Sequence, residues 1–499
     1  LWVLLLSVVY YSRLYSHYFL FRRCIRLLRG KIYRHCIPWK TNPCKLKTYF
    51  LHPHILTING LMNIMRLFSI LLCCILCCSF SIQAQNVLSL QQAVELALKH
   101  NYDILLAKNQ SDIQSIENSW ANAGAYPTVN AGLTTNYSQF SINQELSNGQ
   151  TITGSGVNQQ NTQAFVTLSW RVFDGMRMFA TKSRLEEVQK SGELQLKQQV
   201  MQTMYDVCMA YYGLARLMQQ QKTLDELIRV LEERLRLAEA RLSVGVGTKN
   251  DVLQAKIDIN EQQSARLTVQ NSLAQLTASL NILLGRNPSA VIGVEDSIPL
   301  GAQPDFTGLQ NLTEQQNYST LIAQQELAIA LQQKSEIYAQ GLPSITFNTG
   351  YNYNYNQNSR GLFVINANNG FTAGIGISVP LFNGLITHTQ LATQDMLIQN
   401  RRLQLDALQQ QVRQLYTNAS TNYTNAMATI AIEKNNNELA KENAEIAMER
   451  FKRQSITTPE LRQAQYSIIE SATRLFNAQF TAKAAELQIQ LLAGNLKVQ

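Results

Sequence analysis

Cysteine and histidine are scarce in most of this chain, and the scarcity excludes two kinds of site. After residue 84 the 499-residue sequence keeps one of its eight cysteines, Cys208, and two of its six histidines, His100 and His388. A chain with one thiol has no internal disulfide framework, and two distant histidines form no cluster with metal-ligand spacing. We therefore expect Cys208 to be a small core residue and expect no bound metal.

Catalytic sequence motifs are absent as well. The chain has no nucleophile elbow, no Walker loop and no zinc-protease motif. The run Gly245–Lys249 superficially resembles a phosphate loop, but helical sequence flanks it on both sides, whereas a phosphate loop follows a strand. We expect a protein that is not an enzyme and that has no cofactor.

The basic net charge of the chain comes from its front segment. Residues 1–84 hold 11 of the 43 lysines and arginines and none of the 34 acidic residues. The rest of the chain has 32 basic residues against 34 acidic ones, a net charge of −2. We therefore expect no nucleic-acid partner, because the excess positive charge lies in a segment that the mature protein is expected to lack.

Residues 62–84 have the pattern of a secretory signal peptide. Arg66 supplies the positive charge, Leu67–Ile82 the short apolar run, and Ala84 a small residue at the cleavage position. The mature chain is therefore expected to begin at or near Gln85.

Residues 1–61 match no targeting class and begin with a leucine. We interpret them as a spurious upstream extension. The alternative is a membrane anchor through Leu1–Phe21, which the charge of Arg13 disfavours.

The remaining sequence repeats one long unit. Asn101–Tyr102 recurs as Asn317–Tyr318, 216 positions later, and Phe173–Gly175 recurs in the form of Phe382–Gly384, 209 positions later. Duplication of a long unit is typical of pseudo-symmetric, architectural proteins rather than of scaffolds around a single site.

This duplication suggests three segments after the signal peptide. We expect a first repeat at 86–286, an equatorial linker with little periodicity at 287–312, and a second repeat at 313–499.

Each repeat contains two runs in which apolar and polar residues alternate. They predict strands at about 127–140 and 163–174 and again at about 343–356 and 370–382, and the polar run between the first two is expected to be a loop. One interpretation is a sheet in a soluble protein, with one face buried against a core. Membrane strands of ~9–11 residues fit better, because aromatics cluster near the ends and the opposite face is small and polar.

Four membrane strands cannot form a closed barrel, since the smallest membrane barrels have about eight strands. An open sheet edge in lipid would leave backbone groups without hydrogen bonds. We therefore expect the strands to be shared between chains: two chains would supply eight strands and three would supply twelve. The residues alone leave this choice open.

A very long helix is predicted after each strand pair, at about 176–243 and 385–454, with no proline inside either one. Each would be on the order of 100 Å long at ~1.5 Å per residue. Shorter return helices are predicted at 248–284 and 458–493. The helices before the strand pairs, roughly 102–124 and 318–340, would supply the missing length if they stack end to end on the return helices.

The run Arg241–Ala255 (RLSVGVGTKNDVLQA) and the run Leu90–Asn101 (LQQAVELALKHN) resemble the first helical-hairpin tip and the opening helix of the TolC-like outer-membrane efflux protein family. The resemblance covers essentially all of 86–499. It implies a homotrimer in which a twelve-stranded β-barrel in outer-membrane lipid continues into a twelve-helix α-barrel in the periplasm.

In that family the trimer serves as the exit duct of a tripartite pump. The resemblance therefore implies two partners, a periplasmic adaptor protein and an inner-membrane pump driven by protons or by ATP. The expected function is passive, gated conduction of small molecules such as drugs. The alternatives are one-step (type I) protein secretion and, more remotely, a non-channel coiled-coil surface protein.

Two hairpin tips, at 244–251 and 453–460, are the candidate sites that this resemblance implies. The second tip departs from the family pattern, because it has no Val-Gly pair. Asp251 and Glu460 would form threefold acidic sets and are candidates for the periplasmic entrance or gate. The residues expected to dock the adaptor are Val244, Gly245, Gly247, Thr248, Thr457 and Thr458.

Overall fold

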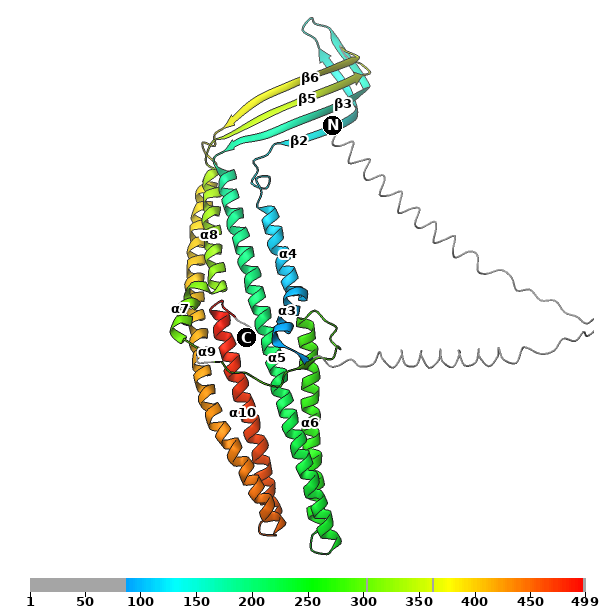
Figure 1. Cartoon of the computed structure of the whole chain (residues 1–499). Coiled ribbons are helices and arrows are strands. Elements are labelled where there is room, and N and C mark those ends of the chain that lie inside the picture. The colour runs from blue at the N-terminus through cyan, green and yellow to red at the C-terminus, as the bar shows by residue number, and fades with distance from the viewer. Residues whose placement is uncertain (1–86, 302–303, 361–362, 497–499) are drawn as a thin grey trace, which may run out of the picture. The chain divides into compact units, whose positions relative to one another are not determined.

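The computed structural model describes residues 87–301, 304–360 and 363–496 (Figure 1). The chain divides into two units, Leu1–Gln83 and Ala84–Gln499. The first unit lies wholly outside the described residues, as does the rest of the expected signal peptide. Within the second unit a four-stranded sheet lies at one end of a set of long helices (Figure 1). Among the described residues, no helix carries an apolar stretch long enough to cross a membrane.

The two longest helices, α5 (Arg177–Ser243) and α9 (Ile386–Lys452), have 67 residues each. At ~1.5 Å per residue each is on the order of 100 Å long. The return helices α6 (Lys249–Leu283) and α10 (Thr458–Leu492) have 35 residues each. All four lie within two residues of their predicted bounds, because no proline interrupts them and a tight turn ends each long helix.

The shorter helices show where the second repeat begins. Helix α3 (Leu90–His100) and helix α7 (Phe306–Gln316) both have 11 residues and lie 216 positions apart. The segment 287–312 is therefore not a plain linker, and the equivalence of the repeats starts near Asp305 rather than at 313. Asp305 is the N-cap of α7 and accepts a hydrogen bond from the Gly308 amide at 3.2 Å. Gly308 weakens the helical pattern, which explains why the sequence did not reveal α7.

Helices α4 (Tyr102–Glu117) and α8 (Tyr318–Ala339) follow α3 and α7. Helix α8 ends one residue before its predicted end at 340, but α4 stops seven residues before the predicted end at 124. The Asn122 side chain donates a hydrogen bond to the Glu117 carbonyl oxygen at 2.9 Å, and so satisfies a carbonyl group that has no partner within the helix. The segment after Glu117 forms turns up to Gly124, whose φ is 81°.

A pair of equivalent asparagines stacks the short helices end to end along the long ones. The Asn101 side-chain oxygen accepts from the backbone N–H groups that begin α4, and its amide donates to the Leu283 carbonyl oxygen at the end of α6 at 2.9 Å. Asn317 caps α8 and donates to the Leu492 carbonyl oxygen at the end of α10 at 3.0 Å. Each asparagine therefore joins the start of an upper helix to the end of a return helix, which is the stacking that the helix lengths predicted.

The sheet is antiparallel, with strand order β2-β3-β5-β6. Strand β2 (Thr128–Glu145) and strand β3 (Thr151–Asp174) form a hairpin that is much longer than predicted. Most of the polar run expected to be a loop is strand instead. Glu145 pairs with Thr151, so the ladder satisfies the backbone groups of this Asn- and Gln-rich segment although its composition disfavours strands.

Strands β5 (Ser344–Asn358) and β6 (Ile365–Ser378) form the second hairpin. Strand β6 was predicted at 370–382, but it begins five residues earlier and ends four residues earlier. It starts where Ile365 pairs with Gln357. It ends two residues before Pro380, which has no N–H group to donate to a ladder.

A short parallel pairing fixes the start of the described chain at the middle of the helices. Strand β1 (Val87–Leu88) pairs with β4 (Gly293–Val294), which lies inside the segment expected to be a linker. The Tyr211 hydroxyl of α5 donates to the Leu88 carbonyl oxygen at 2.9 Å and accepts from the Glu295 amide at 3.1 Å. The surrounding core includes Cys208, which is 1% exposed, as expected for a small core residue.

We predict that Gly285→Ala destabilises the fold more than Gly149→Ala does. Both glycines have positive φ, so either alanine carries a cost of ~1–2 kcal/mol for a left-handed conformation. A Cβ on Gly285 would also lie 2.4 Å from the His100 carbonyl oxygen, whereas nothing lies within 4 Å of a Cβ on Gly149. Thermal unfolding followed by the helical circular-dichroism signal measures the difference, and equal melting temperatures would contradict this account of the junction.

Candidate functional site at the helical tips

Two tight turns lie at the ends of the helices remote from the sheet (Figure 1). The first joins α5 to α6 through Val244–Gly247, and Thr248 is the N-cap of α6. The second joins α9 to α10 through Arg453–Ile456, and Thr457 is the N-cap of α10. The structure thus places both predicted tips at the same end of the helices.

The glycines of the first tip are explained by the turn itself. Gly245 has a φ of 78°, a conformation that favours glycine. A Cβ on Gly247 would lie 2.9 Å from the Cβ of Arg241, and the Gly247 amide donates to the Arg241 carbonyl oxygen at 3.0 Å. Val244 and Val246 have no such structural task, since they are 72% and 63% exposed. The apolar surface of this tip comes from its valines.

The second tip keeps the same turn without glycine. Gln454 stands 209 positions after Gly245 and has a φ of 59°. The Ser455 amide donates to the Arg450 carbonyl oxygen at 2.9 Å, which closes the turn. A left-handed conformation costs a non-glycine residue roughly 1–2 kcal/mol. The missing Val-Gly pair therefore changes the surface of the second tip but leaves its backbone path intact.

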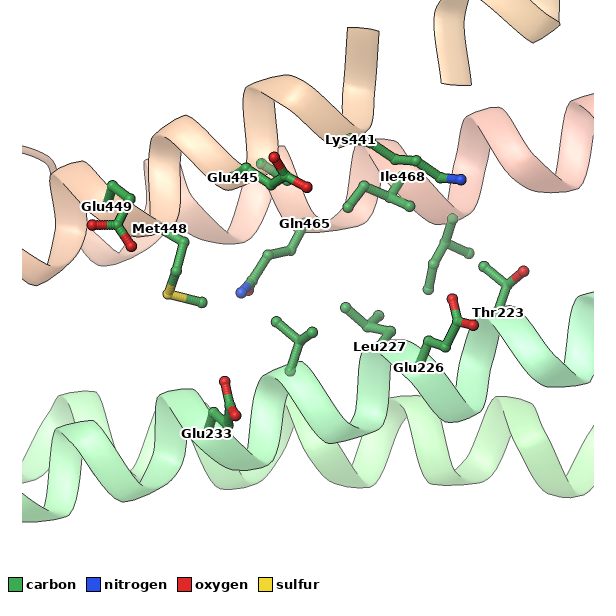
Figure 2. A pocket seen from close by; sticks show the side chains of 13 residues that line it. Thr223, Glu226, Leu227, Glu233, Lys441, Glu445, Met448, Glu449, Gln465 and Ile468 are labelled. Atoms are coloured by element: carbon green, nitrogen blue, oxygen red, sulfur yellow. The ribbon is translucent and has the colours of Figure 1, made fainter. Parts of the chain in front are cut away.

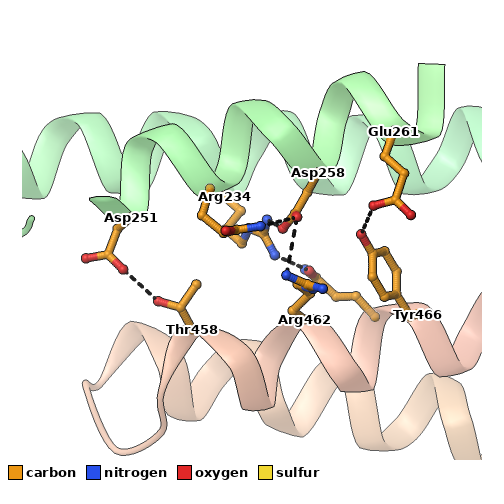
Figure 3. Close-up of polar contacts among 9 residues, drawn as sticks. Arg234, Asp251, Asp258, Glu261, Thr458, Arg462 and Tyr466 are labelled. Atoms are coloured by element: carbon orange, nitrogen blue, oxygen red, sulfur yellow. Dashed lines mark hydrogen bonds and ion pairs between the residues drawn. The ribbon is translucent and has the colours of Figure 1, made fainter. Parts of the chain in front are cut away.

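Asp251, a predicted gate residue, is held by hydrogen bonds within and between the tips. Its carboxylate accepts from the Thr248 hydroxyl at 2.7 Å, and its amide donates to the Thr248 side-chain oxygen at 3.2 Å. The Thr458 hydroxyl of the other tip also donates to this carboxylate, at 3.1 Å (Figure 3). The Thr248 hydroxyl lowers the pKa of Asp251 most, and Thr458 and the positive charge of Arg241 act in the same direction.

Glu460, the second predicted gate residue, makes a simpler contact. Its exposed carboxylate accepts a hydrogen bond from the Thr457 amide of the same tip at 2.8 Å. Both predicted gate residues therefore act as caps of the return helices. Only Asp251 is also bonded to the opposite tip.

A cleft of about 390 Å³ lies between the two tips. Four of the predicted site residues line it, namely Gly247, Asp251, Thr457 and Thr458. The other four predicted residues, Val244, Gly245, Thr248 and Glu460, do not.

Arg241 and Phe451 also line this cleft, although neither was predicted from the sequence. The Arg241 guanidinium lies 4.6 Å from the centroid of the Phe451 ring and donates to the Phe451 carbonyl oxygen at 2.8 Å. It thereby satisfies a carbonyl group at the end of α9 and fastens one tip to the other. The sequence shows that Arg241 lies in the last turn of α5. It does not reveal the contact with Phe451, because the two residues are 210 positions apart.

A second polar cluster joins the two hairpins above the tips (Figure 3). Arg234 of α5 and Asp258 of α6 form an ion pair in which the side chains are 2% and 1% exposed. The Arg234 guanidinium also donates to the Gln465 side-chain oxygen of α10 at 3.2 Å. Arg462 of α10 lies 3.7 Å from the Asp258 carboxylate. The buried charges are therefore partnered from three helices.

Comparison with known proteins identifies this architecture. Residues 93–286 match the model of a family described as outer membrane efflux protein. Outer membrane efflux protein BepC of Brucella suis biovar 1 is 22% identical over 343 residues, which are 66% of this chain and 72% of BepC. The resemblance to the TolC-like outer-membrane efflux proteins is confirmed.

Solved structures share the TolC-like fold over most of the chain. The outer membrane protein VceC of Vibrio cholerae has a TM-score of 0.67 at 21% identity, covering 82% of this chain and 97% of VceC. The CmeC outer membrane channel of Campylobacter jejuni has a TM-score of 0.66 at 14% identity, covering 81% of this chain and 85% of CmeC. Of these two, CmeC is described as a channel, and similarity at this level of identity shows the shared fold.

We predict that Asp258→Ala destabilises the helical end of the protein by ~3–5 kcal/mol, because it leaves Arg234 buried without its charge partner. The double variant Arg234→Met with Asp258→Leu should regain most of that loss, since neither charge is then buried. Thermal unfolding of the two purified variants measures the difference. A double variant as unstable as the single one would show that packing, not charge, sets the cost.

Proposed function

We propose that three copies of this chain form an exit duct that conducts small molecules passively across the outer membrane. The observation that carries the proposal is the four-stranded sheet. Strands β2 and β6 form its two edges, and within the described residues each has one side without a strand partner. In lipid the backbone groups of these edges need hydrogen-bond partners, and neighbouring chains would supply them by closing a barrel.

One face of the sheet has the exposed apolar side chains of a lipid-facing surface. Leu133 of β2 is 73% exposed, and Phe371 and Ile375 of β6 are each 71% exposed. These residues alternate along the strands with asparagine, glycine and threonine, whose small polar side chains suit a water-filled interior. A soluble protein would expose so large an apolar surface only if a partner covered it.

Strand edges in lipid must find hydrogen-bond partners, because each unsatisfied backbone group costs several kcal/mol there. Neighbouring chains can supply them if β6 of one chain pairs with β2 of the next. Three chains would then give a closed barrel of twelve strands. The trimer is supported by the similarity to outer-membrane efflux proteins rather than by the edges alone.

The long helices would continue this barrel as a periplasmic tube. Helices α5 and α9 start next to the sheet and run to the tips, and three chains would contribute twelve helical segments at each level. The family model and the curated relative are both named for the outer membrane, in line with the predicted location. A duct of this kind passes its solutes on without catalysis or energy input of its own.

The tips would be where the duct meets the rest of an export system. An adaptor protein would dock at Val244, Gly245, Gly247, Thr248, Thr457 and Thr458 and connect the duct to an inner-membrane pump. Asp251 and Glu460 would lie in threefold sets at the periplasmic entrance. The hydrogen bond between Asp251 and Thr458 of the opposite tip would hold the entrance in a resting position, and docking would break it.

We predict that the purified protein is a trimer, because a single sheet cannot satisfy its own edges in lipid. Cross-linking in mild detergent should trap three chains, and a cysteine pair placed on β2 and β6 should form disulfides between chains. A stable monomer with full strand content would contradict the duct.

We predict that Val244→Glu with Val246→Glu abolishes most export while trimers still form. Both valine side chains are exposed, and the turn uses only their backbone amides, so the charges should disturb docking rather than folding. Accumulation of a fluorescent dye in cells that carry the matching adaptor and pump measures export. Val291→Glu, at an apolar residue that is 75% exposed far from the tips, is the matched control. Unchanged export in the tip variant would place docking elsewhere.

A further inference from the structure

A groove of about 590 Å³ lies between α5, α9 and α10, farther from the turns than the cleft between the tips (Figure 2). Its apolar lining includes Leu227 and Val230 of α5, Met448 of α9 and Ile468 of α10. The volume is within the range of ~300–1,000 Å³ that small-molecule sites occupy. None of the residues predicted to dock an adaptor lines this groove.

Four glutamates surround the apolar lining. Glu226 and Glu233 come from α5, and Glu445 and Glu449 come from α9 (Figure 2). Glu449 is paired with Lys452 at 2.8 Å. The other three form no ion pair with any described residue, and all three are exposed. Lys441 is the single basic side chain among the lining residues, so the groove is negative overall.

Gln465 adds a hydrogen-bond donor at the bottom of the groove. Its side chain is 2% exposed and points into the groove from α10 (Figure 2). Arg234 donates to its Oε1 atom, which fixes the orientation of the amide. The Nε2 group then faces away from Arg234, and it has no hydrogen-bond partner among the described residues. A buried donor without a partner is uncommon in a folded protein, and here a ligand atom could satisfy it.

We propose that this groove binds an amphipathic organic cation that carries a hydrogen-bond acceptor. The apolar body would pack on Leu227, Val230 and Ile468, where its burial supplies most of the affinity. The positive charge would lie near the unpaired carboxylates of Glu233 and Glu445. The acceptor would meet the Nε2 group of Gln465. The three features lie in one volume, so a single small molecule can satisfy them together.

A small molecule fits these observations better than a protein helix does. The unpartnered donor belongs to a side chain that is 2% exposed, so only a group small enough to enter the groove can meet it, which favours a compact ligand over a helix backbone. A basic amphipathic peptide is therefore an outcome that the test must be able to detect. The proposal goes beyond the duct, because binding to the isolated protein requires no adaptor, pump or transport.

The first test is the binding of rhodamine 6G, a cationic amphiphile with an ester carbonyl, to the purified protein by fluorescence polarisation. The parent should bind it, and Glu233→Gln with Glu445→Gln should weaken the affinity about tenfold, as expected for the loss of two exposed charge contacts. Glu442→Gln is the matched control, because Glu442 lies on α9 but does not line the groove. Raising the salt concentration should weaken binding to the parent more than binding to the double variant.

The second test separates the groove from non-specific charge. Val230→Trp should fill the groove and abolish binding without affecting the fold, since Val230 is 36% exposed. Gln465→Leu should weaken rhodamine 6G but not tetraphenylphosphonium, a cation with no hydrogen-bond acceptor, when the two compete. Thermal unfolding of each variant checks that it remains folded.

Three results would overturn the proposal. One is binding of anionic fluorescein as tight as that of rhodamine 6G. Another is equal affinity in the parent, the Glu233/Glu445 variant and Val230→Trp. The third is binding of a basic amphipathic peptide in the absence of any rhodamine binding, which would assign the groove to a protein partner. Each result stands whether or not the protein proves to be an export duct.

Discussion

The rest of the helical structure depends on one hydrogen bond that occurs twice, from an asparagine amide to the last carbonyl group of a return helix. Asn101 and Asn317 make this bond while their side-chain oxygens cap the helices that follow. Neither α4 nor α6 is long enough to accompany α5, but stacked end to end, with 16 and 35 residues, they follow most of its 67. The junction is tight enough that only glycine fits at Gly285 and Gly494, because the carbonyl oxygens of the facing helix lie within 2.4 and 2.8 Å of a Cβ there.

Equal lengths in the two repeats place the two tips at the same level. Helices α5 and α9 have the same number of residues, as do α6 and α10, so both turns come at the same distance from the sheet. Because the turns are level, Arg241 can reach the end of α9 and Thr458 can reach Asp251. A deletion of a few residues in one repeat would separate these partners. The contacts between the tips therefore require the two repeats to have helices of equal length.

The sequence predicted the long helices closely, because proline is absent from them and each ends at a marked turn. It failed where local composition and tertiary pairing disagree. The Asn- and Gln-rich ends of β2 and β3 have the composition of a loop, but the hairpin ladder pairs their backbone groups and holds them as strands. Helix α7 was missed because Gly308 obscures its pattern.

At the site, the capping of the return helix by Thr248 and Asp251 could be predicted from four consecutive positions. The contacts of Arg241 with Phe451 and of Arg234 with Gln465 could not, since each joins residues more than 200 positions apart.

The two acidic regions of the helical end differ in how their charges are held, and this difference assigns them different tasks. The Asp251 carboxylate accepts from hydroxyl groups of both tips, and these hydrogen bonds lower its pKa. These hydrogen bonds hold the two tips in position. A cation that bound to the Asp251 carboxylate would have to compete with them. Glu233 and Glu445 have no such partners among the described residues and flank an apolar surface with a buried free donor. Charges that are left unpaired beside an apolar groove can attract a ligand without breaking any contact of the protein. We therefore propose different roles for the two regions: the hydrogen bonds of Asp251 hold the two tips together until a partner docks, whereas the groove above them binds a ligand.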